Sequence, residues 1–452
     1  MGWFRRISCL SYSAKLKMRK QAVVVGGILI HLTLGNLYSF GNMMTYMVSY
    51  MHLNVDSSVN YGNFVWVNSI CVAAQGLFMA FGGVLEKCIG PKLTCLIGCS
   101  LLSAGIMLTY YAIEISLYTV ILTYGFLSGL GISLAYVTPL ACGMQWYPQR
   151  KGLINGLIVG GFGLGALGST TFQTYYLNPQ NISPQADGFF TDSSILERLP
   201  SLFYILGCVF LAMQLTGCLL LSKPSGVGER CLQEGENLLA AAEDIDLTEF
   251  GASSSPGQMV KELQPKEVIR NKTFYVFWMI YLLNTIAVGY INAMYKSFGQ
   301  TFINDDHFLA QIGSFASIFN AVGRVLWGRL MDKTSFKTSM RILATLLSVF
   351  FGTMPLTQYM GKVFFSLWVW IIFFTFSGTF VLMPTVIEKA FGSKHYSSNY
   401  GLLFTSQTIS GPLVAAVNQS MLHSVGYTGC FLTVSFIVFL SVGLTFLVPG
   451  GL

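Results

Sequence analysis

The stretch "SIFNAVGRVLWGRLMDK", residues 317–333, places Arg324 inside a run of otherwise apolar and small residues. An unpaired guanidinium in hydrocarbon costs at least about 2.5 kcal/mol, so this position needs a physical reason. Steps of three and four residues return to one face of a helix, and from Arg324 they meet Gly313, Ser317, Asn320 and Gly328. This small, polar face predicts that Arg324 points into the protein. The alternative is that Arg324 snorkels to the inner membrane surface, about 9 Å away.

The composition is that of an integral membrane protein. The chain has 452 residues, of which 53% are hydrophobic and 10% are charged, whereas soluble domains have about 25% charged residues. Apolar runs of about 20 residues, each long enough to cross the bilayer as a helix, recur along the chain. We predict an all-α protein with twelve transmembrane helices, beginning near residues 21, 61, 93, 116, 152, 201, 274, 308, 341, 363, 400 and 428.

Basic residues gather in the N-terminal segment and in every second connection between the expected spans. These segments carry 22 of the 26 Lys and Arg residues. Because cytoplasmic loops are enriched in Lys and Arg, both termini are expected to be cytoplasmic. The plasma membrane is the default location, and an organelle membrane is the alternative.

The chain divides into two similar halves. A polar stretch with nine acidic and six basic residues separates six expected spans from six more, so the expected divisions are a basic N-terminus (1–20), a six-helix bundle (21–222), a cytoplasmic linker (223–273) and a second bundle (274–452). "GVLEKCIGPK" (83–92) matches "GRLMDKTSFK" (328–337) at a spacing of 245 residues. Two pseudo-symmetric six-helix bundles around a site at the bilayer midplane are a transporter architecture.

Several motifs carry a resemblance to known transporters. "GRLMDK" resembles the conformational loop of the major facilitator superfamily, here Gly328, Asp332 and Lys333, while Lys87 stands at the usual acidic position of the first copy. The stretches 129–165, with "WYPQRKG", and 384–411, with "NYGLL", are similar to the oxalate/formate antiporter group and the neighbouring monocarboxylate transporters. The resemblance covers nearly the whole chain.

The resemblance implies a site for an organic anion. In these families an arginine at the position of Arg324 binds the substrate carboxylate, and its planar fork matches two oxygens. Monocarboxylate members often carry Asp where this chain has Asn320, and oxalate-specific members carry Lys at the best match to Gln407. A single cation suits a substrate with one negative charge, so a monocarboxylate is favoured. An oxalate/formate-type exchanger and a non-transporting membrane sensor are the alternatives.

Other residues of the spans have two interpretations each. By resemblance, Tyr38 and Tyr136 face the substrate, and aromatic packing between helices is the alternative. His31 is a candidate proton site or a neutral interior histidine. Lys296 is expected near the outer end of its span, either as a charge in an outer vestibule or snorkelling to the surface. Asn181, in "NIS", is a candidate glycosylation site.

The remaining features favour no other class of protein. The ten cysteines show no metal-binding spacing, so neither a metal nor a cofactor is expected. The glycines of residues 152–165 lack the G-K-[ST] of a nucleotide loop and instead allow close helix packing, at Gly152, Gly156 and Gly160 or at Gly161 and Gly165. An enzyme is not expected, because only His31 among the histidines lies deep in a span. The expected partners are a small organic anion, the lipid bilayer and either protons or a counter-anion, with no nucleic acid.

Overall fold

The computed structural model describes residues 2–147, 151–185, 187–224, 262–392 and 395–450, without the side chains of 2–15, 87, 151–153, 332 and 397. Within these residues the chain is helical and contains no strand. Ten helical segments are long and apolar enough to cross a membrane. One of them, α18 (Tyr396–Leu444), turns at Gly426 and makes two spans, and α7 (Lys151–Leu177) is long enough to be a further one. The twelve expected spans are therefore all present in the described chain.

The N-terminal half is built from segmented spans. Its helices are α1 (Gly2–Leu34), η1 (Gly35–Ser39) and α2 (Phe40–Asn54) in the first span, then α3 (Tyr61–Ile89), α4 (Pro91–Ala112), α5 (Leu117–Val120), η2 (Ile121–Leu127), α6 (Ser128–Trp146), α7, α8 (Ser193–Leu196) and α9 (Leu199–Leu220). The expected starts of spans two to six lie within two residues of the first residues of α3, α4, α5, α7 and α9. In the first span, α1 begins earlier than expected, at Gly2.

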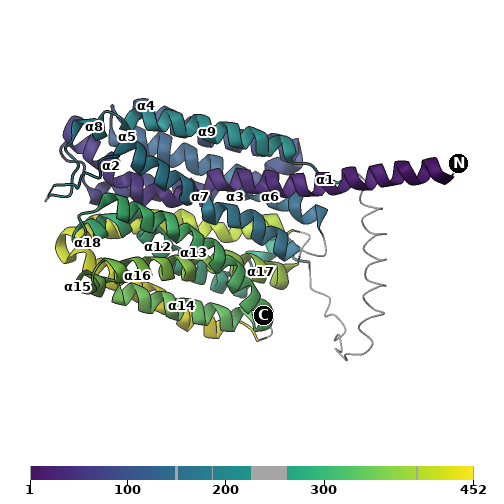
Figure 1. The fold of residues 1–452 in the computed structure, drawn as a ribbon. Coiled ribbons are helices and arrows are strands. Elements are labelled where there is room, and N and C mark those ends of the chain that lie inside the picture. Colours follow the sequence, from purple (N-terminus) through teal and green to yellow (C-terminus); the bar gives the residue numbers. More distant parts are fainter. Residues whose placement is uncertain (1, 148–150, 186, 225–261, 393–394, 451–452) are drawn as a thin grey trace.

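The C-terminal half repeats the arrangement. Its helices are α11 (Pro265–Val268), α12 (Lys272–Gln300), α13 (Asp306–Lys333), α14 (Phe336–Thr353), η4 (Met354–Leu356), α15 (Thr357–Met360), α16 (Lys362–Ser377), α17 (Thr379–Phe391), α18 and η5 (Thr445–Leu447). In Figure 1, α1 to α9 lie together in the upper half of the view and α12 to α18 in the lower half. The helix pairs that join the halves include α3 with α18, α7 with α13, α2 with α12 and α3 with α12.

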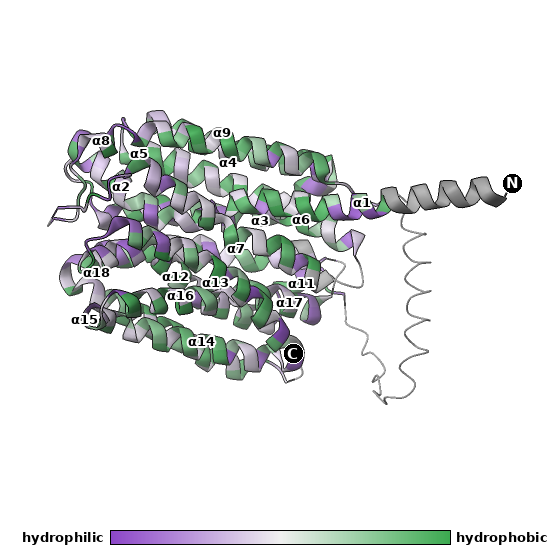
Figure 2. Ribbon diagram, viewed as in Figure 1, coloured by the Kyte–Doolittle hydropathy of each residue, from purple (hydrophilic) through white to green (hydrophobic). Residues whose placement is uncertain are grey.

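Polar and apolar side chains are distributed as in a protein embedded in a lipid bilayer. Large apolar side chains face outward, among them Leu219, Val363 and Phe436, which are 78%, 63% and 62% exposed. Figure 2 shows hydrophobic residues along the outer surfaces of the helices and hydrophilic residues gathered at their ends. Polar residues are buried inside instead, where other helices can satisfy their hydrogen bonds. The integral, multi-pass class is thus confirmed.

Glycines let α7 approach the first span closely. A Cβ atom on Gly35 would lie 2.1 Å from the carbonyl oxygen of Phe162, and one on Gly165 would lie 2.4 Å from the carbonyl carbon of Gly35. A Cβ atom on Gly156 or Gly160 would meet nothing within 4 Å. Of the two glycine series in α7, the series with Gly165 therefore makes the contact with the first span. This contact holds the first span in place at η1, where the α-helix is interrupted.

We predict that Gly165→Ala lowers the free energy of unfolding by about 1–3 kcal/mol, because the added methyl group clashes with backbone atoms that cannot move independently. Gly160→Ala, on the same helix, should be neutral or stabilising by up to about 1 kcal/mol. The thermal unfolding midpoints of the two purified variants check this. Equal midpoints for both variants would contradict the assigned contact.

Candidate functional site

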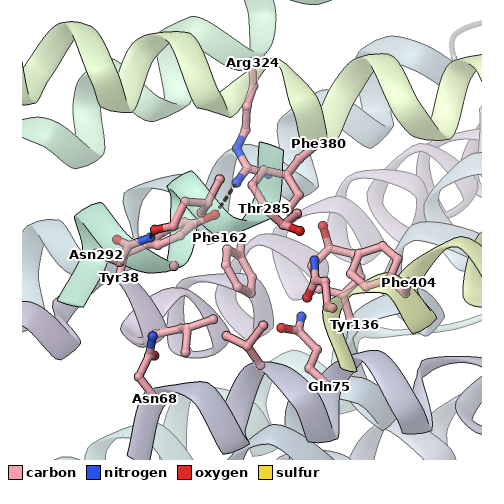
Figure 3. A pocket seen from close by; sticks show the side chains of 15 residues that line it. Tyr38, Asn68, Gln75, Tyr136, Phe162, Thr285, Asn292, Arg324, Phe380 and Phe404 are labelled. Atoms are coloured by element: carbon pink, nitrogen blue, oxygen red, sulfur yellow. Dashed lines mark hydrogen bonds between the residues drawn. The ribbon is translucent and has the colours of Figure 1, made fainter. Parts of the chain in front are cut away.

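A small cavity of about 40 Å³ lies between the two halves. Its walls come from η1, α3, α6 and α7 of the first half and from α12, α13, α17 and α18 of the second. Figure 3 shows Arg324 reaching into the cavity from one side and residues of α3 facing it from the other. The polar residues of the lining are Tyr38, Asn68, Gln75, Tyr136, Thr285, Asn292, Arg324 and Gln407.

Arg324 is buried at the wall of this cavity. Its side chain is 2% exposed, so it does not snorkel to the membrane surface. Its Nε donates to Asn320 Oδ1 at 2.9 Å and its Nη2 donates to Tyr38 Oη at 3.2 Å, while Nη1 is buried without a partner. The bond to Tyr38 joins α13 to η1, so it crosses between the halves (Figure 3).

The amphipathic pattern of α13 accounts for this orientation. Ser317, Asn320 and Arg324 are buried on one face, whereas Phe315 and Val322 on the other face are 48% and 46% exposed. The face predicted from the helical spacing thus points inward. Gly328 continues that face and packs against α17, where an added Cβ atom would lie 3.3 Å from Val381.

The guanidinium of Arg324 has no counter-charge among the side chains that the structure describes. Among the described residues, none that lines the cavity is acidic. The described salt bridges join Lys223 to Glu86 and Lys296 to Asp306, and neither includes Arg324. The guanidinium carbon lies 5.2 Å from the ring centroid of Phe380 and 5.9 Å from that of Phe162, which stabilises a cation only weakly. The arrangement favours an anion in the cavity.

The other expected site residues lie around Arg324 at different depths. Tyr136 lines the cavity, and its ring lies 5.1 Å from the imidazole of His31. His31 sits behind Tyr136, where its Nδ1 is 3.0 Å from the Gly27 carbonyl oxygen and its Nε2 has no partner. Gln407 lines the cavity and donates from Nε2 to Tyr281 Oη at 2.8 Å. The structure thus brings four of them to one cavity: Tyr38, Tyr136, Arg324 and Gln407.

The expected loop and glycosylation residues lie away from the cavity. Lys333 is exposed at the end of α13, and the side chains of Lys87 and Asp332 lie outside the described residues. Asn181 is exposed in the loop after α7, at a positive φ of 55°. Its Nδ2, the atom that would carry a glycan, donates to Asp305 Oδ1 at 3.1 Å.

The structure corrects the expectation for Lys296. Its side chain is 0% exposed, so it neither snorkels to the surface nor stands in an open vestibule. Its Nζ lies 2.7 Å from Asp306 Oδ1 and donates to Asn42 Oδ1 at 2.7 Å. Spacing along α12 could not reveal this, because Asp306 lies on the next helix and was expected in the connection before it.

Both charges of this ion pair also bind the opposite half. Asn42 and Tyr46 belong to α2, and Tyr46 donates its hydroxyl hydrogen to Asp306 Oδ2. Asn178, which follows α7, donates from Nδ2 to the same oxygen at 3.0 Å. The network lies at the end of the molecule away from the two termini (Figure 1). It therefore holds the halves together at that end.

Sequence reasoning missed four polar residues of the cavity: Asn68, Gln75, Thr285 and Asn292. The signal for the first two was present, because Asn68 and Gln75 are seven residues apart and so share one face of an otherwise apolar helix. An amide that faces lipid has no partner for its hydrogen bonds, so two amides on one face of a span predict that this face points into the protein.

We predict that Asp306→Leu lowers the free energy of unfolding by about 3–5 kcal/mol, because it leaves the Lys296 ammonium group buried without a counter-charge. The double variant Lys296→Met with Asp306→Leu should recover most of that loss. Thermal unfolding of the purified variants checks this, with Glu197→Leu, which removes an exposed carboxylate, as the control. A double variant less stable than Asp306→Leu would contradict the pairing.

Comparisons with known proteins agree with this architecture. The model of the Major Facilitator Superfamily matches residues 32–416. Apicoplast pyruvate carrier 1 of Toxoplasma gondii is 28% identical over 94% of this chain and 88% of its own, and the oxalate:formate antiporter of Oxalobacter formigenes is 22% identical over 81% and 78%. Monocarboxylate transporter 13 of Rattus norvegicus is 31% identical over 25% of this chain and 26% of its own. The expected resemblance is confirmed: the chain belongs to the Major Facilitator Superfamily of membrane transporters.

Proposed function

We propose that this protein is a secondary transporter of a small monocarboxylate, with Arg324 as the anchor for the carboxylate group. One observation carries the proposal: a guanidinium is buried between the two halves with no acidic residue beside it in the described lining of the cavity. The names of the similar proteins, a pyruvate carrier and an oxalate:formate antiporter, support a carboxylate substrate. Pyruvate is the first candidate.

A carboxylate would satisfy the site as it stands. Nη1 of Arg324 has no partner, and Nη2 is bonded only to a phenol hydroxyl that can move aside. An arginine can hold two carboxylate oxygens through parallel hydrogen bonds, which are stronger than bonds between neutral groups. A bound anion would also neutralise the buried charge, whose desolvation is costly while it is unpaired.

The number of cations argues for one carboxylate on the substrate. Arg324 is the single cation in the described lining of the cavity. Gln407, at the position where oxalate-specific relatives carry Lys, is neutral and bonded to Tyr281. A second carboxylate would therefore be desolvated without a counter-charge, which disfavours oxalate relative to a monocarboxylate.

The transport cycle in this proposal is alternating access by two units, residues 21–222 and 274–452, joined by the linker 223–273 with both termini in the cytoplasm. The substrate binds at the interface of the units, where their relative motion exposes it to one side of the membrane and then to the other. The network around Lys296 and Asp306 holds the units together at one end, so access from that end requires these bonds to break.

We predict that Arg324→Ala reduces the uptake of labelled pyruvate into proteoliposomes by about 100-fold at low concentration, because the charge-assisted hydrogen bonds to the carboxylate are lost. Arg324→Lys should retain part of the activity, since it keeps the charge without the planar fork. Arg19→Ala removes an exposed cation of α1 and serves as the control. Uptake by Arg324→Ala at the wild-type rate would show that the anchor is assigned wrongly.

His31 is our proposed proton site if the cycle is coupled to protons, because its Nε2 has no partner and its ring packs against Tyr136 of the cavity wall. Acid outside the vesicles should then stimulate pyruvate uptake, and His31→Gln should abolish the stimulation. His423→Gln, at an exposed position of α18, is the control. Pyruvate uptake that does not depend on the pH gradient and requires an anion inside the vesicles would instead indicate anion exchange.

A further inference from the structure

Two amide side chains face Arg324 across the cavity. Asn68 and Gln75 both belong to α3, are 4% exposed and line the cavity. Figure 3 shows both on the α3 side, opposite the guanidinium. They are separated by two helical turns, or about 10 Å along the axis. Arg324 belongs to the second half and these amides to the first, so the cavity has a cationic wall and a neutral polar wall.

These two amides lack the kind of partners that Gln173 and Gln214 of the same half have. Gln173 is bonded to Asn42 at 3.2 Å and to Ser39 at 3.0 Å, and Gln214 is bonded to Ser103 at 2.7 Å and to Thr33 at 2.9 Å. Those glutamines join helices of the first half and are explained by packing. Within the described part of the chain, Asn68 Oδ1 is buried without a partner, and neither Asn68 nor Gln75 is bonded to another helix as those glutamines are.

A third amide extends the polar wall toward α12. Asn292 lines the cavity and donates from Nδ2 to the Val288 carbonyl oxygen at 2.9 Å. This bond fixes the orientation of the amide, because a flipped Asn292 would bring two oxygens together. Its Oδ1 therefore remains an acceptor, and it has no partner.

We propose that Asn68 and Gln75, with Asn292 beside them, form a second subsite that binds an uncharged oxygen substituent of the substrate. The substrate class is then a short monocarboxylate that carries an oxo or hydroxyl group, as in 2-oxo and 2-hydroxy acids. This inference rests on the proposed function, in which Arg324 holds the carboxylate, and it adds what the opposite wall recognises.

The chemistry of the three groups selects this class. Side-chain amides donate and accept hydrogen bonds but carry no charge, so they match a carbonyl or hydroxyl oxygen and do not neutralise a second carboxylate. An unsubstituted alkyl acid would displace water from these amides and leave them unbonded. Sites built to bind a polar group reject the analogue that lacks it, whereas apolar pockets discriminate poorly between similar substrates.

Such a substrate would bridge the two halves. Its carboxylate would bind α13 of the second half and its oxygen substituent would bind α3 of the first. Asn292 of α12 would add a contact in the second half, but only a substrate with both groups bonds to Arg324 and to the α3 amides, so only such a substrate favours closure of the halves around it. The α3 amides would then contribute to transport as well as to affinity, because a ligand shifts a conformational equilibrium by its differential affinity for the two states.

The test compares pyruvate, lactate and propionate, which have three carbons and differ at C2. In wild-type proteoliposomes, propionate should compete with labelled pyruvate at least about tenfold less well than lactate does. In Gln75→Leu and in Asn68→Leu the affinity for pyruvate and lactate should fall, while that for propionate stays the same or rises. The ratio of the affinity for lactate to the affinity for propionate should therefore approach one.

Matched controls keep the outcome interpretable. Gln311→Leu makes the same chemical change at an exposed position of α13 outside the cavity. Its ratio of lactate affinity to propionate affinity should equal that of the wild type. Thermal stabilisation of each purified variant by the three acids gives a second readout that does not require transport. A variant that runs as a single species in size-exclusion chromatography and is stabilised by propionate is folded and retains the Arg324 subsite.

Three results would overturn the inference. If propionate competes as well as lactate in the wild type, the amide wall recognises no oxygen substituent. If Gln75→Leu and Asn68→Leu weaken the binding of all three acids equally, the amides only support the fold. If none of the acids binds or is transported and Arg324→Ala changes nothing, the proposed function fails, and this inference fails with it.

Discussion

The buried guanidinium of Arg324 constrains the whole arrangement of the cavity. A cation at this depth is stable only if its surroundings compensate for lost water, and here the compensation is incomplete: one bond to Asn320, one to Tyr38, and two aromatic rings. A carboxylate on a neighbouring helix would complete it and would also close the site to anions. The described lining of the cavity contains none. Because the positive charge of Arg324 is only partly compensated, this position favours an anionic ligand.

Lys296 shows the opposite solution to the same physical problem. It is as deeply buried as Arg324, yet it is paired with Asp306 at 2.7 Å and bonded to Asn42. A buried cation that is already paired with a carboxylate gains little from an anion, but the partners of this pair on α2 and after α7 make it specific for the state in which the halves touch. The two buried cations therefore differ in their surroundings: Lys296 is paired with a carboxylate, whereas Arg324 is not paired with one among the described residues.

The sequence predicted features that depend on local periodicity and missed those that depend on contacts between helices. The apolar runs predicted the spans, and the small polar face around Arg324 predicted its inward orientation, because both patterns lie within one helix. The pairing of Lys296 with Asp306 depends on how α12 and α13 meet, and the roles of Asn68 and Gln75 depend on what their neighbours leave unbonded. The contrast between Gln75 and Gln173 cannot be seen in their residue type, since only the surrounding donors and acceptors distinguish them.

The bond between Arg324 and Tyr38 bears on how the proposed substrate would act. At 3.2 Å, this bond links the second half to the first. In the proposed function, a substrate carboxylate bound to Arg324 would compete with Tyr38 and so would remove one contact between the halves. The oxygen substituent, bound at the proposed α3 subsite, would replace that contact with another. A ligand lacking the substituent would remove the first without forming the second, and so it would bind Arg324 without favouring closure of the halves.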